Sequence, residues 1–167
     1  LKAFKQVGYK VPVALSATIE ATGTMLAGQN IEAFYASVAH LEPLYIGMNC
    51  AMGPSQMKEH IRSLAEISQF PVSIIPNAGL PDEDGHYHET PELVASVLEN
   101  YINEGWVNVV GGCCGTQPAH IKSLAELIKD KAPRGIKPDD TLRLSGIETL
   151  NVEDDGRPYI VGERTNV

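Results

Sequence analysis

The chain has 167 residues, of which 43% are hydrophobic, which is enough for one globular domain with a buried core. It carries 13 Lys and Arg against 21 Asp and Glu, and this net charge of -8 argues against a general nucleic-acid-binding surface. No apolar run approaches the ~18 residues of a membrane-spanning helix, and no secretory signal pattern is present. The chain has three cysteines, two of them adjacent, so a disulfide framework is not expected. We expect a cytoplasmic location instead.

The first residues predict the end of an amphipathic helix, with Leu1, Phe4 and Val7 on one side, and we expect the sequence to be a piece of a longer chain. After it, short apolar runs alternate with segments of helical periodicity. The predicted strands are residues 11–18, 44–50, 72–77 and 107–113. The predicted caps of the helices that follow them are Asn30, Ser55, Thr90 and Thr116.

Strands that alternate with helices in this way predict an α/β fold with a parallel sheet covered by helices. The candidates are a doubly wound open sheet and a (β/α)8 TIM barrel. No G-x-G-x-x-G sequence follows the first strand, which argues against a dinucleotide-binding open sheet. Four strand–helix units would make half of a barrel, and we expect residues 1–132 to form this half-barrel.

The character of the sequence changes after residue 132. Residues 133–157 are rich in Pro, Gly and Asp and predict an interdomain linker with at most a short ordered piece. Residues 158–167 become β-like again at Tyr159, and we expect them to be the first strand of a following domain.

Side chains that can bind a metal or take part in catalysis lie where the predicted strands end. The first strand ends near Ser16, the second at Cys50, the third at Asn77 and the fourth at Cys113 and Cys114. In parallel α/β folds the carboxyl ends of the strands meet on the face that carries the active site. We therefore expect these side chains to lie close together.

Three cysteines on one face favour a zinc site. A catalytic zinc takes three protein ligands and keeps a fourth position open, and thiolates are soft donors that select zinc over magnesium or calcium. Adjacent cysteines can share a metal only where the backbone bends, and the glycines around the pair permit this: Gly111, Gly112 and Gly115.

Other interpretations of the same residues stay open. The cysteines could be buried packing residues or, less favourably, a vicinal disulfide. The glycine-rich loop before a helix could bind phosphate. His86 and His88 could bind a metal, although two exposed histidines of a solvated loop are the more common case.

Three segments resemble the signature stretches of the zinc-dependent homocysteine S-methyltransferases. They are IGMNCAMGP at 46–54, PNAGLP at 76–81 and VGGCCGT at 110–116, the last followed by Pro118 and His120. The resemblance covers roughly the first 132 residues. It implies the carboxyl-terminal half of that family's barrel, strands five to eight.

The tail is similar to a junction found in the cobalamin-dependent methionine synthases of this family. There, stretches like RLSGIE at 143–148 and YIVGERTNV at 159–167 lead from the homocysteine barrel into a folate-binding barrel. The resemblance implies zinc bound by Cys50, Cys113 and Cys114, with the homocysteine sulfur as fourth ligand. The amide oxygen of Asn77 would fill that position when homocysteine is absent.

The implied reaction transfers a methyl group from methylcobalamin, held by another domain, to the homocysteine thiolate, giving methionine. Partners would be homocysteine and the cobalamin and folate domains of the same full-length chain. Since half a barrel leaves two sheet edges open, we expect pairing with a second copy as a homodimer or membership of a larger chain, and no turnover by this piece alone. Two alternatives remain: a single-domain enzyme using betaine or S-methylmethionine, and a non-catalytic fragment with structural cysteines.

Overall fold

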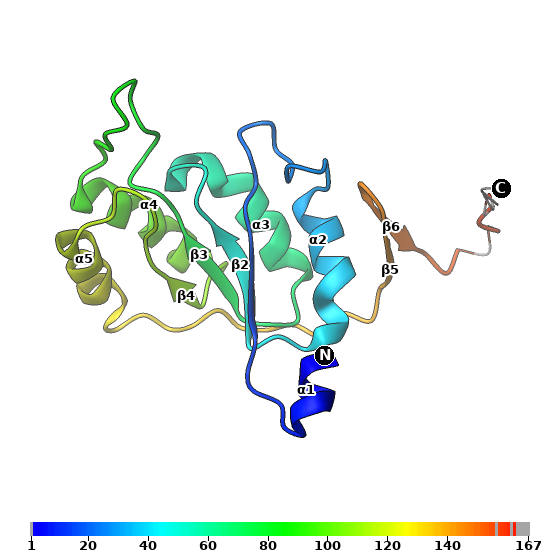
Figure 1. Ribbon diagram of the computed structural model, residues 1–167. Coiled ribbons are helices and arrows are strands. Elements are labelled where there is room, and N and C mark those ends of the chain that lie inside the picture. The colour runs from blue at the N-terminus through cyan, green and yellow to red at the C-terminus, as the bar shows by residue number, and fades with distance from the viewer. Residues whose placement is uncertain (1, 156, 161, 163–167) are drawn as a thin grey trace.

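The computed structural model describes residues 2–155, 157–160 and 162. A four-stranded parallel sheet with its helices forms the main body, and a two-stranded antiparallel hairpin follows (Figure 1). In chain order the elements are α1 (Lys2–Val7), β1 (Ala14–Ala17), α2 (Ile31–Val38), η1 (Ala39–Leu41), β2 (Tyr45–Asn49), η2 (Pro54–Met57), α3 (Lys58–Ile67), β3 (Val72–Ile75), α4 (Pro91–Asn103), β4 (Val109–Val110), α5 (Pro118–Ile128), β5 (Leu142–Ser145) and β6 (Thr149–Val152). In the described part of the chain, no helix has the length and apolarity needed to cross a membrane.

The sheet has the strand order β1-β2-β3-β4, and each neighbouring pair is parallel. Helices connect the strands, so the α/β prediction with a parallel sheet is confirmed. The strands are shorter than expected at their ends. The last one spans only Val109–Val110, although Gly111 N and Cys113 N after it still donate to Ile74 O and Pro76 O.

One face of the sheet forms the core with the helices. Ile46 and Met48 of β2 and Val72 and Ile74 of β3 are fully buried in one apolar cluster with residues of α2, α3 and α4. The alternating side chains point to the other face. Most of these are exposed or half-buried, among them Ala14, Ser16, Tyr45, Asn49 and Ile75, whereas Ser73 of β3 is fully buried.

Two of the four predicted helix caps are confirmed. The side chain of Asn30 accepts a hydrogen bond from Ala33 N, and that of Thr90 accepts one from Leu93 N. The prediction for Ser55 is wrong because this residue lies inside η2, which leads directly into α3.

The prediction for Thr116 is also wrong, because the cap of α5 lies one residue further along the chain. Gln117 holds that position and forms a reciprocal capping box with His120. At the start of the chain, the expected helix is present as α1, but none of its described residues is buried.

The segment after α5 is fixed to the main body. Arg134, only 7% exposed, donates hydrogen bonds to the carbonyl oxygens of Ala65, Ser68 and Phe70, where α3 ends. From there the chain runs along the edge of the sheet where the strands begin and reaches the hairpin (Figure 1). Arg134 therefore anchors the start of the predicted linker to the main body, a contact that the linker prediction did not include.

The short ordered piece expected in this segment is the β5–β6 hairpin, which packs on α2. Ser145 Oγ donates to Ala33 O, and Asn30 N donates to Ile147 O. The opposite side of the hairpin is apolar and exposed, with Leu142, Leu144 and Leu150.

The strand expected over residues 158–167 is not formed in the part that the structure describes. Residues 157–160 and 162 have no helix or strand, and the remaining residues, 161 and 163–167, lie outside the described ones. Tyr159 instead bonds back to the hairpin, with its hydroxyl donating to Asn151 O.

Candidate metal centre

Cys50 follows β2 in a strained turn. Its φ is 62° and that of Ala51 is 60°, both in the left-handed region that disfavours residues with a side chain. Cys50 N still donates to Ile75 O of the next strand, while Met52 N closes the turn on Cys50 O. The strand hydrogen bond and the turn together fix the position of the Cys50 sulfur at the carboxyl edge of the sheet.

Cys113 and Cys114 lie in the bend between β4 and α5. Cys113 N donates to Pro76 O, and Ala78 N donates to Cys114 O, so the bend is bonded to the loop after β3. Gly115 has a φ of 74°, a conformation that glycine adopts without cost. The glycine-rich sequence therefore allows the sharp bend that places both thiols on one side.

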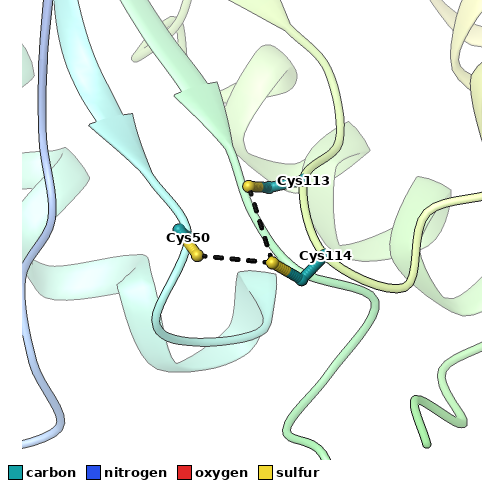
Figure 2. A group of neighbouring side chains, drawn as sticks. All are labelled: Cys50, Cys113 and Cys114. Carbon is teal, nitrogen blue, oxygen red and sulfur yellow. Dashed lines mark hydrogen bonds between the residues drawn. The ribbon is translucent and has the colours of Figure 1, made fainter.

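The three sulfur atoms meet in one cluster (Figure 2). The Cys50 and Cys114 sulfurs are 3.6 Å apart, those of Cys113 and Cys114 are 4.0 Å apart, and all three lie within 4.8 Å of one another. Tetrahedral zinc with Zn–S bonds of about 2.3 Å separates its sulfur ligands by roughly 3.8 Å. The donor set and the spacing therefore fit a zinc ion.

The cysteines are neither fully buried nor joined in a disulfide. All three are free thiols; Cys114 is exposed, and Cys50 and Cys113 are half-buried. A disulfide would need its sulfurs about 2.05 Å apart, whereas those of the adjacent pair are 4.0 Å apart. Thiols at the carboxyl edge, partly open to solvent, are accessible to a metal and a substrate.

The surroundings act differently on two of the thiols. The backbone N–H of Ala51 lowers the pKa of Cys50, against an opposing effect of burial, and the other two cysteines and Asn77 lower it further. Burial raises the pKa of Cys113, and its interaction with Cys50 raises it too. Cys50 is thus the better prepared thiolate, while Cys113 needs a cation to ionise at neutral pH.

Asn77, two residues after β3, lies beside the cysteine turns, as its place at the end of the predicted strand 72–77 indicated. The residue is 3% exposed, and its Oδ1 accepts a hydrogen bond from Cys114 N at 3.1 Å. Its side chain also lowers the pKa of Cys50. Asn77 therefore connects the two backbone turns that carry the sulfurs.

Ser16, near the end of β1, does not join this cluster, contrary to the expectation that the strand-end side chains lie together. Its hydroxyl donates to Asn49 Oδ1 at 2.6 Å.

The phosphate-binding interpretation of the glycine-rich loop is not supported. Its N–H groups at Cys113, Cys114 and Thr116 all donate to acceptors within the chain. A phosphate cradle needs such groups free to point at the ligand.

The two loop histidines lie apart from the sulfurs, as their solvated character predicted. His88 Nε2 is 2.6 Å from Asp82 Oδ2, and His86 N donates to Asp82 Oδ1. Among the described residues, the only group of three or more metal-ligating His, Cys, Asp or Glu side chains is the cysteine cluster.

One residue beside the cysteine cluster, Tyr87, was not predicted from the sequence. Tyr87 lies between the two histidines, but unlike them it is half-buried and packs on Gly115, next to Cys114. Burial raises the pKa of Tyr87, and the charge of the Cys114 thiolate raises it further. The only sequence signal was an aromatic residue inside a polar loop after a strand end.

Comparison with known proteins gives a family and a fold. The sequence model of the family described as homocysteine S-methyltransferase matches residues 1–128. The oxidised form of the homocysteine methyltransferase MmuM from Escherichia coli is similar in structure, with a TM-score of 0.55 and 19% sequence identity. The metallated form of the same enzyme gives a TM-score of 0.52 and 18% identity.

These likenesses cover 75% of this chain but only 39% and 38% of the MmuM chains, so the sequence spans well under half the length of those relatives. At this identity the structural match shows a common fold. The family match extends over most of the chain and includes Cys50, Cys113 and Cys114. The chain belongs to the homocysteine S-methyltransferase family.

Proposed function

We propose that this chain is the zinc-binding, carboxyl-terminal half of a homocysteine methyltransferase barrel, within a cobalamin-dependent methionine synthase. The observation that carries the proposal is the cluster of three cysteine sulfurs within 4.8 Å of one another at the carboxyl edge of the parallel sheet. The family provides the substrate, homocysteine, and the class of reaction, methyl transfer to sulfur.

The residues present fit zinc. Three thiolates are the soft donor set that zinc prefers, and a catalytic site binds through three protein ligands. A metallated form of MmuM, which shares the fold, is consistent with this assignment. Bound zinc would hold the substrate thiol as a thiolate at neutral pH, where a free thiol is mostly protonated.

The chain contributes the ligands and their placement. Cys50, Cys113 and Cys114 would hold the metal, and their combined negative charge would keep the substrate sulfur electron-rich. Asn77 would serve as fourth ligand in the absence of homocysteine, because its buried amide lies between the cysteine turns. The substrate sulfur then attacks the methyl carbon: a sulfur–carbon bond forms, and the donor keeps the electron pair of the bond that breaks.

The half-barrel assignment is supported by the shape of the sheet. Four parallel strands have one face buried under helices and the other lined mostly by exposed or half-buried side chains. β1 and β4 are the outermost strands of this sheet, and each has one side without a partner strand among the described residues. The remaining half of the barrel, from a longer chain or from a second copy in a homodimer, would cover that face and complete the site.

The methyl donor that we propose is methylcobalamin, held with folate by other domains of a longer cytoplasmic chain. Two features support such neighbours: the sequence over 143–148 and 159–167, and the apolar side of the hairpin, which no described residue covers. Betaine and S-methylmethionine are the competing donors. Methionine formation by the intact protein with each donor in turn distinguishes the three.

The first test is metal content. Purified under reducing conditions, the parent chain should hold about one zinc, and Cys50→Ala should lose it, since two thiolates remain. Ser16→Ala is the matched control, because its hydroxyl bonds Asn49 at the neighbouring strand end and none of the cysteines. A parent without zinc, or a Cys50→Ala variant that retains it, would contradict the metal site.

The second test concerns the substrate. In the cobalt-substituted parent, homocysteine should add a fourth sulfur ligand and increase the thiolate-to-cobalt charge-transfer absorption. Homoserine, which has oxygen in place of sulfur, should not. A metal-loaded chain whose spectrum ignores homocysteine would remove support for substrate binding by this part of the barrel while leaving the metal site intact.

A further inference from the structure

The backbone of the cysteine turn belongs to a chain of hydrogen bonds that joins three segments of the protein. Ala78 N, in the loop after β3, donates to Cys114 O at 2.9 Å, and Glu89 N, just before α4, donates to Ala78 O at 3.1 Å. Glu89 O in turn lies 2.9 Å from Nε2 of His120, in the first turn of α5. The bonds therefore run from the cysteine turn through two other segments to the helix that follows it.

The amino end of α5 closes these bonds into a ring. Gln117 N donates to Nδ1 of His120 at 3.2 Å, which is the histidine half of the capping box. Thr116 N donates to Cys113 O at 3.1 Å and so holds the start of the helix on the cysteine turn. The other bonds of the ring join backbone groups, so His120 is the side chain through which the ring is closed.

The two partners of His120 define where its ring proton lies. Gln117 N is a donor, so Nδ1 accepts and carries no proton. Nε2 then holds the proton and donates it to Glu89 O, which can only accept. The residue is 6% exposed, so water has little access to either bond.

The side chain of Glu89 extends the ring to the turn that carries Cys50. A Cβ atom added to Gly53 would lie 2.9 Å from Glu89 Oε1, and one added to Gly79 would lie 2.8 Å from Glu89 Cγ. Both glycines therefore leave space that Glu89 fills. Since Gly53 follows Cys50 in the same loop, the position of Glu89 affects where that loop lies relative to Cys114.

We propose that His120 is a positioning residue of the metal site, which closes the ring and so sets the Cys113–Cys114 turn against the turn of Cys50. This inference rests on the proposed zinc function. The Cys50 and Cys114 sulfurs, from these two turns, are 3.6 Å apart (Figure 2), close to the roughly 3.8 Å that tetrahedral zinc requires. A ring that holds this spacing before the metal arrives lowers the cost of ordering the ligands.

The test compares two substitutions in the 167-residue chain that differ only in an N–H donor. His120→Gln can accept from Gln117 N and donate to Glu89 O, whereas the carboxylate of His120→Glu can only accept. Both residues suit this capping position, so α5 should stay capped in each. We expect a zinc affinity near the parent's in His120→Gln and one about tenfold weaker in His120→Glu, measured by chelator competition. In the cobalt-substituted chains, the d–d bands, which report the ligand geometry, should move only in His120→Glu.

Two further variants separate the lost donor from the added charge. The negative charge of His120→Glu would by itself favour a cation, so it does not explain weaker binding. His40→Glu makes the same change at an exposed residue of η1 and should bind zinc as the parent does. His120→Asn places an amide oxygen near the position of Nδ1 but is too short to reach Glu89 O. It should lose as much affinity as His120→Glu without adding charge, and it replaces that variant if His120→Glu does not fold.

Each contrary outcome has a distinct meaning. Parental zinc affinity in His120→Glu and His120→Asn, or equal losses in His120→Gln and His120→Glu, would overturn the role of His120 and leave the metal site standing. A loss of the same size in His40→Glu would do so too. Nitrogen NMR of the metal-free parent that finds the imidazole proton on Nδ1 would contradict the ring itself. A parent that binds no zinc would overturn the proposed metal site, and this inference with it.

Discussion

The edge where the strands begin (the amino edge) and the edge where they end (the carboxyl edge) each carry a buried or half-buried asparagine, and the two asparagines have different roles. At the edge where strands begin, Asn108 Oδ1 accepts from Val72 N, and Asn108 Nδ2 donates to Arg134 O. At the edge where strands end, Asn77 Oδ1 accepts from Cys114 N. The first asparagine joins structural segments only, while the second joins the turns that carry reactive thiols.

The edges also differ in what their backbone carries. Two left-handed residues, Cys50 and Ala51, lie at the edge where strands end, and there the sulfurs are partly open to solvent, whereas the left-handed Glu42 before β2 is an exposed residue of a connection. The amino edge has the buried Arg134, whose guanidinium is bonded to three carbonyl oxygens. Strained backbone concentrates where a protein places chemistry, and well-satisfied polar contacts lie where it needs stability. Changes at the two edges should therefore separate stability from metal binding.

The largest expected effect is the loss of Arg134. Arg134→Ala removes a buried cation and leaves the carbonyl oxygens of Ala65, Ser68 and Phe70 without their donor. We expect a loss of about 3 kcal/mol in the free energy of unfolding, measured by urea denaturation. Zinc bound per folded chain should not change.

Arg62→Ala on α3 is the control for this change. Arg62 pairs with Glu59 and Glu66 on an exposed face, where ion pairs contribute little. Equal losses in the two variants would show that the segment around Arg134 does not hold the sheet edge.

A pair of glycines compares the edges next. Gly115 at the carboxyl edge and Gly105 at the amino edge both have positive φ, 74° and 69°. An added Cβ at Gly105 meets nothing within 4 Å, so Gly105→Ala should cost only about 1 kcal/mol for the backbone conformation. Gly115→Ala must also displace Tyr87, and we expect about 2 kcal/mol and weaker zinc binding.

Unfolding and zinc titration on both glycine variants check this. Zinc affinity that falls equally in Gly105→Ala and Gly115→Ala would mean that the loss comes from general destabilisation and not from the cysteine turn.

The strand-end pattern could predict much of this arrangement. Parallel strands bring their carboxyl ends to one edge, so Cys50, Asn77 and the Cys113–Cys114 pair could be placed together from the sequence alone. Each of these positions depends on a strand and the few residues that follow it. Local patterns of this kind carry their own information about spatial position.

Contacts between distant segments could not be predicted in this way. Arg134 stands in a Pro- and Gly-rich stretch typical of a linker, and its carbonyl partners lie more than sixty residues earlier. Tyr87 stands between two exposed histidines, and only the fold shows that its ring meets Gly115. The caps at Ser55 and Thr116 failed for local reasons. A 3-10 helix that contains Ser55 leads into α3, and the polar neighbour of Thr116, Gln117, caps α5 instead.

The two asparagines provide a smaller and cleaner contrast. Asn77→Ala and Asn108→Ala each remove an acceptor from a backbone N–H, of Cys114 and of Val72, and each should cost about 1 kcal/mol in the free energy of unfolding. Only Asn77→Ala should weaken zinc binding, by about tenfold, because it touches the cysteine turns. Isothermal titration of zinc into both variants measures this, and similar affinities would contradict a role for Asn77 in the site.

The smallest effect concerns pH and the loop that carries Tyr87. The hydrogen bond from His88 holds the pKa of Asp82 below its ordinary value of 3.8, and the backbone N–H of His86 lowers it further. A carboxylate with a lowered pKa stabilises the folded loop fully above its ordinary pKa, and this contribution is lost as the pH falls through the lowered value. The loop of the metal-free chain should therefore loosen below about pH 4, visible as faster hydrogen exchange at the amides of Asp84 and His86.

Asp82→Asn is the control, because the acceptor oxygen remains but the titrating charge does not. Its amide exchange, corrected for the intrinsic pH dependence of exchange, should stay level over the same range. If parent and variant loosen together as acid is added, the loop responds to some other group, and Tyr87 is held over Cys114 by its packing on Gly115 alone.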